Sequence, residues 1–122
     1  MKYETLEKLS KGGYNGPMKK TAPILIELRK GLEAAYGDKL ARLVLYGSRA
    51  RGDSGAGSDW DVAVFLKSFD GLLVELDRIT DITTSILENT GELIAPQAFL
   101  AEEYNSQKIP LMYEIRREGV EI

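Results

Sequence analysis

The stretch LVLYGSRARG at residues 43–52, followed by SDWDVAVFL at residues 58–66, organises the rest of this 122-residue chain. Leu43–Tyr46 is a short apolar run that stops at a glycine, which is typical of a strand buried on both faces. Residues 60–66 form a second apolar run after a glycine-rich loop. The pattern predicts two buried strands that are connected by a Gly-Ser turn, a short helix and a loop.

Two carboxylates, Asp59 and Asp61, stand at the start of the second strand. Side chains two positions apart on a strand point to the same side, so Trp60 between them points the other way, into a core. Neighbouring carboxylates repel each other unless a cation lies between them. Ligands that offer only oxygen suit Mg²⁺ or Mn²⁺, so Asp59 and Asp61 are candidate metal ligands.

Gly47 and Ser48 form the other half of the candidate site. A glycine at the end of a buried strand lets the backbone approach a ligand closely. Ser48 stands where the next helix begins, and the free N–H groups of a helix start attract phosphate. The two strand ends therefore offer a phosphate site and a metal site, and a metal-bound nucleoside triphosphate needs both.

The composition is that of an ordinary single globular domain, with 43% hydrophobic and 29% charged residues. A net charge of −3 argues against strong nucleic-acid binding. The chain has no cysteine and no histidine, which excludes thiol chemistry, imidazole bases and zinc sites built on either. Neither a signal peptide nor a membrane-spanning segment is evident, so we expect a cytoplasmic protein without a membrane partner.

The flanking sequence predicts an α/β fold, with a small mixed sheet and helices packed on one face. Residues 1–19 are expected to form an N-terminal helix or arm, and residues 20–122 a single domain. The further elements expected from periodicity, proline and glycine are helices from Pro23 to Gly37, over Phe69–Asn89, over Ala101–Tyr104 and from Pro110 to Gly119, and a third strand over Glu92–Leu100 that contains Pro96.

Gly47-Ser48, ten residues and then Asp59-Trp60-Asp61 reproduce the GS-x10-DxD signature of the DNA polymerase β-like nucleotidyltransferases. The surrounding LYGSRARG and SDWDV resemble the minimal nucleotidyltransferase (MNT) branch in particular. The closing segment from Pro110 onward is also similar to that branch, so the resemblance covers roughly residues 20 to 122. The joint spacing is a far more specific signal than either short motif alone.

The resemblance implies transfer of a nucleoside monophosphate, AMP from ATP, to a protein hydroxyl. Asp59 and Asp61 would be catalytic and would hold Mg²⁺ or Mn²⁺, while Gly47 and Ser48 would bind the nucleotide. MNT proteins often act as antitoxins of HEPN-domain ribonucleases and modify a tyrosine of the toxin, so a HEPN-domain toxin is the expected partner. The sequence leaves the oligomeric state open, including a homo-oligomer.

Arg49 and Arg51 are candidate nucleotide-binding residues that would contact the triphosphate. An equally good interpretation is that they are solvated charges or partners of Asp53 and Asp59, since charges beside a motif often have no role of their own.

The chain departs from the family pattern at Ala95, where active members carry a third acidic residue directly before a proline. Glu92 lies three residues earlier, so on a strand it would point to the opposite face, unless a bulge re-aims it. Two hypotheses follow. The chain is either a nucleotide-transferring enzyme, or a non-catalytic antitoxin of the same fold that neutralises its partner by contact.

Overall fold

The computed structural model describes residues 22–55 and 57–122, and within them four strands pair into one mixed sheet in the order β3-β2-β1-β4. β1 runs antiparallel to β2 and β4, and β2 runs parallel to β3. The elements in chain order are α2 (Pro23–Tyr36), the 3-10 turn η2 (Gly37–Lys39), β1 (Leu40–Tyr46), α3 (Ser48–Arg51), β2 (Trp60–Leu66), α4 (Leu72–Thr90), β3 (Ile94–Leu100), the 3-10 turn η3 (Ala101–Asn105), α5 (Pro110–Glu118) and β4 (Val120–Glu121).

This architecture confirms the predicted α/β class and its small mixed sheet. α2 begins at Pro23, as predicted, because a proline has no N–H to leave unsatisfied in the first helical turn. The long helix α4 and the strand β3 begin three and two residues later than predicted. The two-residue strand β4 was not predicted, because so short a segment carries no periodic pattern. The arm predicted for residues 1–19 lies outside the described residues.

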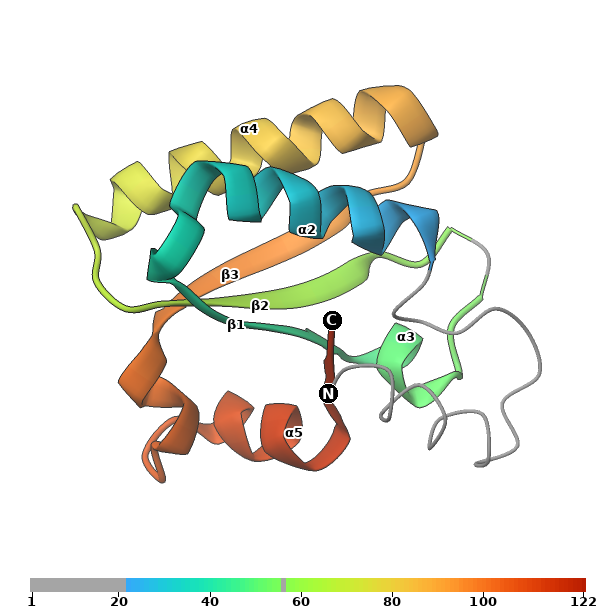
Figure 1. The fold of residues 1–122 in the computed structure, drawn as a ribbon. Coiled ribbons are helices and arrows are strands. Elements are labelled where there is room, and N and C mark those ends of the chain that lie inside the picture. The colour runs from blue at the N-terminus through green and yellow to red at the C-terminus, as the bar shows by residue number, and fades with distance from the viewer. Residues whose placement is uncertain (1–21, 56) are drawn as a thin grey trace.

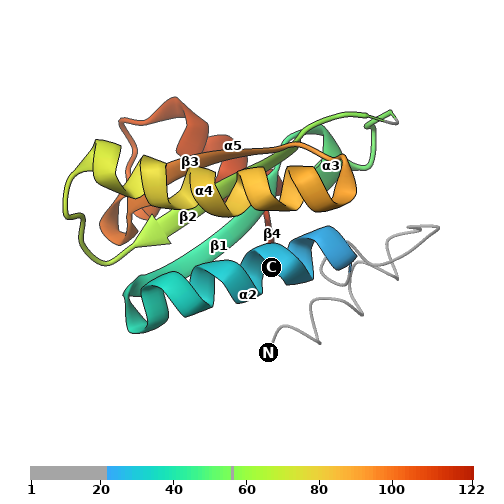
Figure 2. The same ribbon diagram turned by 90° about the horizontal axis from the view of Figure 1, so that it is seen from above.

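Helices lie on both faces of the sheet (Figure 1). α2 and α4 lie side by side over one face (Figure 2), where Leu28, Val62 and Ile79 belong to the larger apolar cluster. The expectation that the helices pack on one face is wrong for α5, whose packing on the sheet is not visible in local periodicity. α5 packs on the second face, where Met112 and Ile115 are buried against the sheet.

None of the helices in the described part of the chain is long and apolar enough to cross a bilayer.

The strand register brings the end of β1 beside the start of β2. Tyr46 pairs with Asp61 across the antiparallel β1–β2 ladder, and Asp61 pairs with Ala95 across the parallel β2–β3 ladder. Paired residues on neighbouring strands point to the same face. The Gly-Ser turn, the two aspartates and the position of Ala95 therefore meet at one edge of the sheet.

A buried charge cluster occupies the opposite end of β2. Glu75 of α4 is fully buried, and it accepts hydrogen bonds from the Tyr36 hydroxyl at 2.8 Å and from the Asp70 amide at 2.6 Å. Arg78 Nη1 lies 3.3 Å from Glu75 Oε1. Burial alone would raise the pKa of Glu75, but these hydrogen bonds and the Arg78 charge hold that pKa below its usual range. Glu75 thus ties α4 to the end of α2 and to the loop before α4.

Candidate active site

Gly47 forms the turn between β1 and α3 in a backbone conformation that other residues rarely adopt, with φ 75° and ψ −157°. A Cβ added at this position would overlap the Asp61 carboxylate. The absence of a side chain therefore allows the Asp61 carboxylate to lie directly against the turn backbone. This contact joins the two halves of the predicted site.

The two aspartates lie at the start of β2 with different exposure. Asp59 directly precedes the strand and is exposed, whereas Asp61 lies within it and is half-buried. The pKa of Asp61 is raised above its usual range by burial and then by the nearby charges of Asp59 and Glu114, while Arg51 acts in the opposite direction. Negative charge is thus concentrated at this edge of the sheet.

The chemistry of these donors fits a hard divalent cation. The negative charges of Asp59 and Glu114 contribute to the raised pKa of Asp61, and a cation beside Asp59 and Asp61 would offset them. No group of three or more acidic, cysteine or histidine side chains with metal-binding geometry occurs within residues 22–55 and 57–122. Mg²⁺ is commonly bound through one or two carboxylates together with waters and substrate phosphates, so two aspartates suffice for such a site.

Ser48 is the first residue of α3, a helix of four residues. Its carbonyl accepts hydrogen bonds from the amides of Gly52 and Asp53, and the Gly47 carbonyl accepts from Ala50 and Arg51. The first N–H groups of a helix have no partner within the helix. In α3 the Ala50 and Arg51 amides are already bonded to Gly47, which leaves the amides of Ser48 and Arg49 as such groups. The Ser48 side chain itself is half-exposed.

Arg51, the second arginine of the motif, is paired with acidic side chains beside the site. Its Nε lies 3.0 Å from Asp53 Oδ2, and its Nη1 lies 3.6 Å from Glu118 Oε1 of α5. The Arg51 charge partly offsets the raised pKa of Asp61. The pairing with Asp53 is one of the two interpretations that the sequence left open.

Arg49, the first arginine, is directed to the start of β2. Its Nε and Nη2 donate hydrogen bonds to the Ser58 carbonyl at 3.1 and 2.7 Å, and its guanidinium lies 4.2 Å from the centre of the Trp60 ring. Arg49 forms its ion pair with Glu92 rather than with Asp59, with 3.8 Å between Arg49 Nη2 and Glu92 Oε1.

Ala95 lies beside Asp61, where a third carboxylate would complete the family pattern. Glu92 does not take its place, because its Oε1 accepts a hydrogen bond from Trp60 Nε1 at 3.0 Å. Trp60 points to the face covered by α2 and α4, opposite to the face of Asp61. The β2–β3 register is regular throughout, so no bulge turns this segment towards the aspartates.

Three residues that are linked to Asp61 directly or through a neighbour were not singled out from the sequence: Tyr46, Gln97 and Glu114. Tyr46 is buried next to Asp61, and the Tyr46 hydroxyl accepts a hydrogen bond from Gln97 Nε2 at 3.0 Å. Burial, followed by the charge of Asp61, raises the pKa of Tyr46. Tyr46 could have been found from its place directly before Gly47. Gln97 and Glu114 could not, since they reach the site only through the pairing of β3 and the packing of α5.

A nucleotidyltransferase domain of the polymerase β type is the class that this sheet and this arrangement of turn and aspartates define. The chain belongs to that family, because the family model described as "Polymerase beta, Nucleotidyltransferase" matches residues 32–122.

Individual relatives agree with this assignment. A Methanocaldococcus jannaschii protein named "Putative protein adenylyltransferase MJ0141" is 31% identical over 99 residues, which make up 81% of this chain and 95% of the relative. A chain of the solved structure "Crystal structure of the toxin-antitoxin with AMP-PNP" superposes with a TM-score of 0.58 and 17% identity, over 79% of this chain and 69% of the other. At that identity the superposition supports the fold alone.

Proposed function

We propose that this chain is a metal-dependent nucleotidyltransferase that transfers AMP from ATP to a hydroxyl group of a partner protein. The acceptor oxygen would bond to the α-phosphorus as its proton is lost, and the bond to the β-phosphate would break, which releases pyrophosphate. The observation that carries the proposal is the contact of Gly47 with Asp61, which brings a backbone turn suited to phosphate beside two carboxylates suited to Mg²⁺. The name of the M. jannaschii relative supports a protein as the acceptor.

In this proposal Asp59 and Asp61 would hold Mg²⁺. The bound ion would neutralise the negative charge that develops on the phosphoryl oxygens. The Ser48 hydroxyl and the amides of the turn bind and orient the triphosphate. Arg51, which pairs with Asp53 and Glu118 beside the site, is a further candidate for contact with the triphosphate. Phosphoryl transfer needs little beyond this positioning and charge stabilisation.

We further propose a toxin protein of the HEPN type as the partner that carries the acceptor hydroxyl. Two observations support this extension. The sequence resembles the MNT branch around both motifs, and the superposed solved structure is described as a toxin–antitoxin with AMP-PNP. That description also supports an adenine nucleotide as the donor.

The double variant Asp59→Asn/Asp61→Asn tests whether the two aspartates beside the Gly47 turn bind Mg²⁺ and ATP. We expect it to lose Mg²⁺-dependent ATP binding in titration calorimetry while folding at least as stably as the parent, since it removes like-charge repulsion. The matched control is Asp77→Asn/Asp81→Asn, which makes the same charge change at exposed positions of α4. If the site variant binds ATP with Mg²⁺ as tightly as this control, the assignment of the site is wrong.

A second candidate function, a non-catalytic antitoxin that acts by contact, is favoured by one observation. Ala95 offers no carboxylate beside Asp61, and Glu92 is engaged on the other face. A hydroxyl acceptor would then lack the general base that active family members are expected to carry. Nucleotide binding does not require that base. Both candidates can therefore bind ATP, but only the enzyme transfers AMP to the partner.

The discriminating experiment measures transfer of labelled AMP to the co-expressed partner. For the enzyme at saturating Mg²⁺ we expect low transfer by the wild type and unchanged transfer in Glu92→Gln. Transfer should increase in Ala95→Asp, because general-base help is commonly worth ~10²–10⁴-fold. Ala95→Asn is the control of equal shape without the charge. If the wild type and Ala95→Asp show no transfer although both bind ATP and the partner, the contact mechanism replaces the enzyme.

A further inference from the structure

We propose that Arg49 is a positioning residue that holds Asp59 and Asp61 in place from the far side of β2, and is not a ligand of the triphosphate. This inference rests on the proposed nucleotide site. Four interactions connect Arg49 with Ser58, Trp60 and Glu92, and these four residues are called the Arg49 brace below.

The first contact fixes the end of the loop that leads into β2. Two N–H groups of the Arg49 guanidinium converge on the carbonyl of Ser58, the residue directly before Asp59. Arg49 itself follows Ser48 in α3. The hydrogen bonds therefore set the distance between the phosphate-binding turn and the first aspartate, across a loop rich in glycine.

The second contact fixes the residue between the aspartates. The guanidinium lies over the Trp60 ring, and Trp60 Nε1 donates to Glu92 Oε1 at 3.0 Å. The Trp60 amide also donates to the carbonyl of Leu93 at 3.0 Å. Since neighbouring residues of a strand point to opposite faces, fixing the rotation of Trp60 fixes the directions of Asp59 and Asp61.

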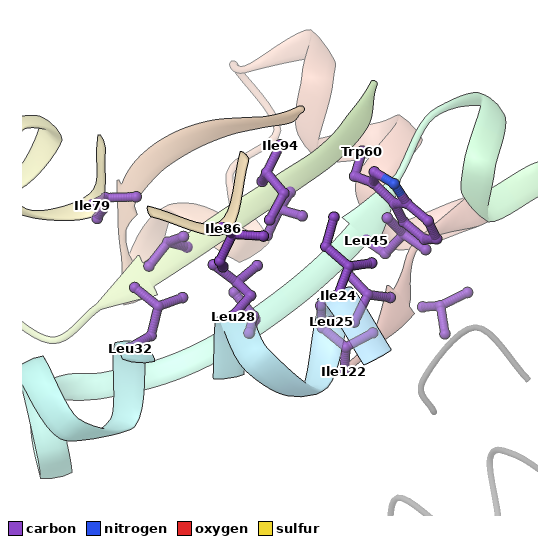
Figure 3. Packing of buried hydrophobic residues seen from close by; sticks show 14 of the residues in the cluster. Ile24, Leu25, Leu28, Leu32, Leu45, Trp60, Ile79, Ile86, Ile94 and Ile122 are labelled. Carbon is purple, nitrogen blue, oxygen red and sulfur yellow. The ribbon is translucent and has the colours of Figure 1, made fainter. Parts of the chain in front are cut away.

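The Trp60 indole also closes one end of the larger apolar cluster, at the same end as Ile24 (Figure 3). The brace thus lies on the face covered by α2 and α4, and the Asp61 carboxylate points to the other face. The Arg49 side chain is only 18% exposed, and two of its N–H groups are already engaged by a carbonyl. A phosphate could recruit these groups only if the loop end were released.

An arginine suits this role better than a lysine. The planar guanidinium presents several donors in a rigid fork and stacks on an aromatic ring, whereas an ammonium is a compact, strongly hydrated charge. Arg49→Lys keeps the positive charge near the site and removes the fork. It therefore separates positioning from simple charge attraction.

The test compares Arg49→Lys and Arg49→Gln with the exposed control Arg117→Gln. Trp60 is the only tryptophan of the chain, so its fluorescence reports on the brace directly, without nucleotide. In both Arg49 variants we expect the Trp60 emission to shift to longer wavelength. Acrylamide should also quench the Trp60 fluorescence more readily than in the wild type. Hydrogen exchange at the Asp59 and Trp60 amides should also accelerate.

With ATP, we expect the Mg²⁺ concentration for half-maximal binding to rise roughly tenfold in both Arg49 variants, as for the loss of one charge-assisted hydrogen-bonded pair. At saturating Mg²⁺ the ATP affinity should stay within about twofold of the control. Glu92→Gln keeps an oxygen that accepts from Trp60, so its effects should be smaller than those of Arg49→Gln.

Two results would overturn the inference. One is an unchanged Trp60 emission together with an unchanged Mg²⁺ requirement in Arg49→Gln, with the circular dichroism spectrum retained. The other is a loss of ATP affinity at saturating Mg²⁺ without any change at Trp60, which would make Arg49 a direct phosphate ligand. If the wild type itself binds no ATP with Mg²⁺, the proposed function fails, while the fluorescence and exchange measurements still decide whether the brace exists.

Discussion

Replacement of Gly47 by alanine is the sharpest test of how the turn and the metal site depend on each other. The Gly47 backbone, with φ 75° and ψ −157°, lies in a region that is nearly exclusive to glycine. The added Cβ would also overlap the Asp61 carboxylate, and it would approach the Cγ of that side chain closely. Asp61 must therefore rotate away from the turn.

The magnitudes of the two effects differ. Backbone strain of this kind costs about 1–3 kcal/mol of folding free energy. Displacement of Asp61 removes a charged contact to the bound metal and nucleotide, which we expect to weaken ATP binding with Mg²⁺ by roughly 10–100-fold, from the ~1.5–3 kcal/mol of such contacts. Gly47→Ala should therefore lower stability moderately and binding strongly.

Gly91→Ala is the matched control for backbone strain. Gly91 has φ 77° at the end of α4, and an added Cβ there would meet nothing within 4 Å. We expect it to lose about 1–2 kcal/mol of stability, measured by urea unfolding, and to keep its ATP affinity in calorimetry. Equal ATP affinity of Gly47→Ala and Gly91→Ala, both folded at the assay temperature, would refute the idea that the turn and Asp61 form one site.

Three further predictions concern single side chains. Ser48→Ala should weaken ATP binding by roughly 1.5–3 kcal/mol without abolishing it, because the backbone amides of the turn remain; calorimetry with no change in affinity would place the phosphate site elsewhere. Glu114→Gln should lower the pKa of Asp61, measured by NMR titration, because the Glu114 charge contributes to raising it; an unchanged pKa would contradict this account. Glu75→Gln should lower stability by roughly 2–3 kcal/mol at pH 7, since the two donors meet different carboxylate oxygens and Gln keeps only one of them. The pKa of Glu75 is lowered in the folded state, so ionised Glu75 stabilises the fold above the unfolded pKa of about 4.3, and this stabilisation is lost as the pH falls. The difference in the free energy of urea unfolding between wild type and Glu75→Gln should therefore shrink below about pH 5. A difference that stays constant with pH would argue against an ionised Glu75.

The elements around the site were predictable because their signals are local. Apolar runs that end at Gly47 and begin at Trp60 indicate two buried strands, and the spacing of the motifs ties a phosphate turn to a pair of carboxylates. The proline at the start of α2 and the glycine after α4 mark helix ends from neighbouring residues alone. None of these signals requires knowledge of a distant part of the chain.

The directions of the two arginines could not be predicted in this way. Arg49 and Arg51 are two apart in the same short helix, yet Arg49 lies over Trp60 while Arg51 pairs with Asp53 and Glu118. Which partner each one meets depends on where β2 and α5 pack against α3. The sequence accordingly supported a triphosphate contact and a salt-bridge partner equally well for both.

The sequence by itself determined the family, the mixed α/β class and the place of Asp59 and Asp61 at the start of a buried strand, because each follows from short-range spacing and strand alternation. The sequence also indicated Ala95 as the place of the missing carboxylate, and strand alternation predicted that Glu92 points to the opposite face. The tertiary structure alone decided that the β2–β3 register is regular, that Glu92 accepts a hydrogen bond from Trp60, and that α5 brings Glu114 to the site. These placements depend on strand register and helix packing between segments tens of residues apart. A local pattern predicts the face of the sheet to which a side chain points, but the residues that this side chain contacts depend on the packing of the whole sheet and its helices.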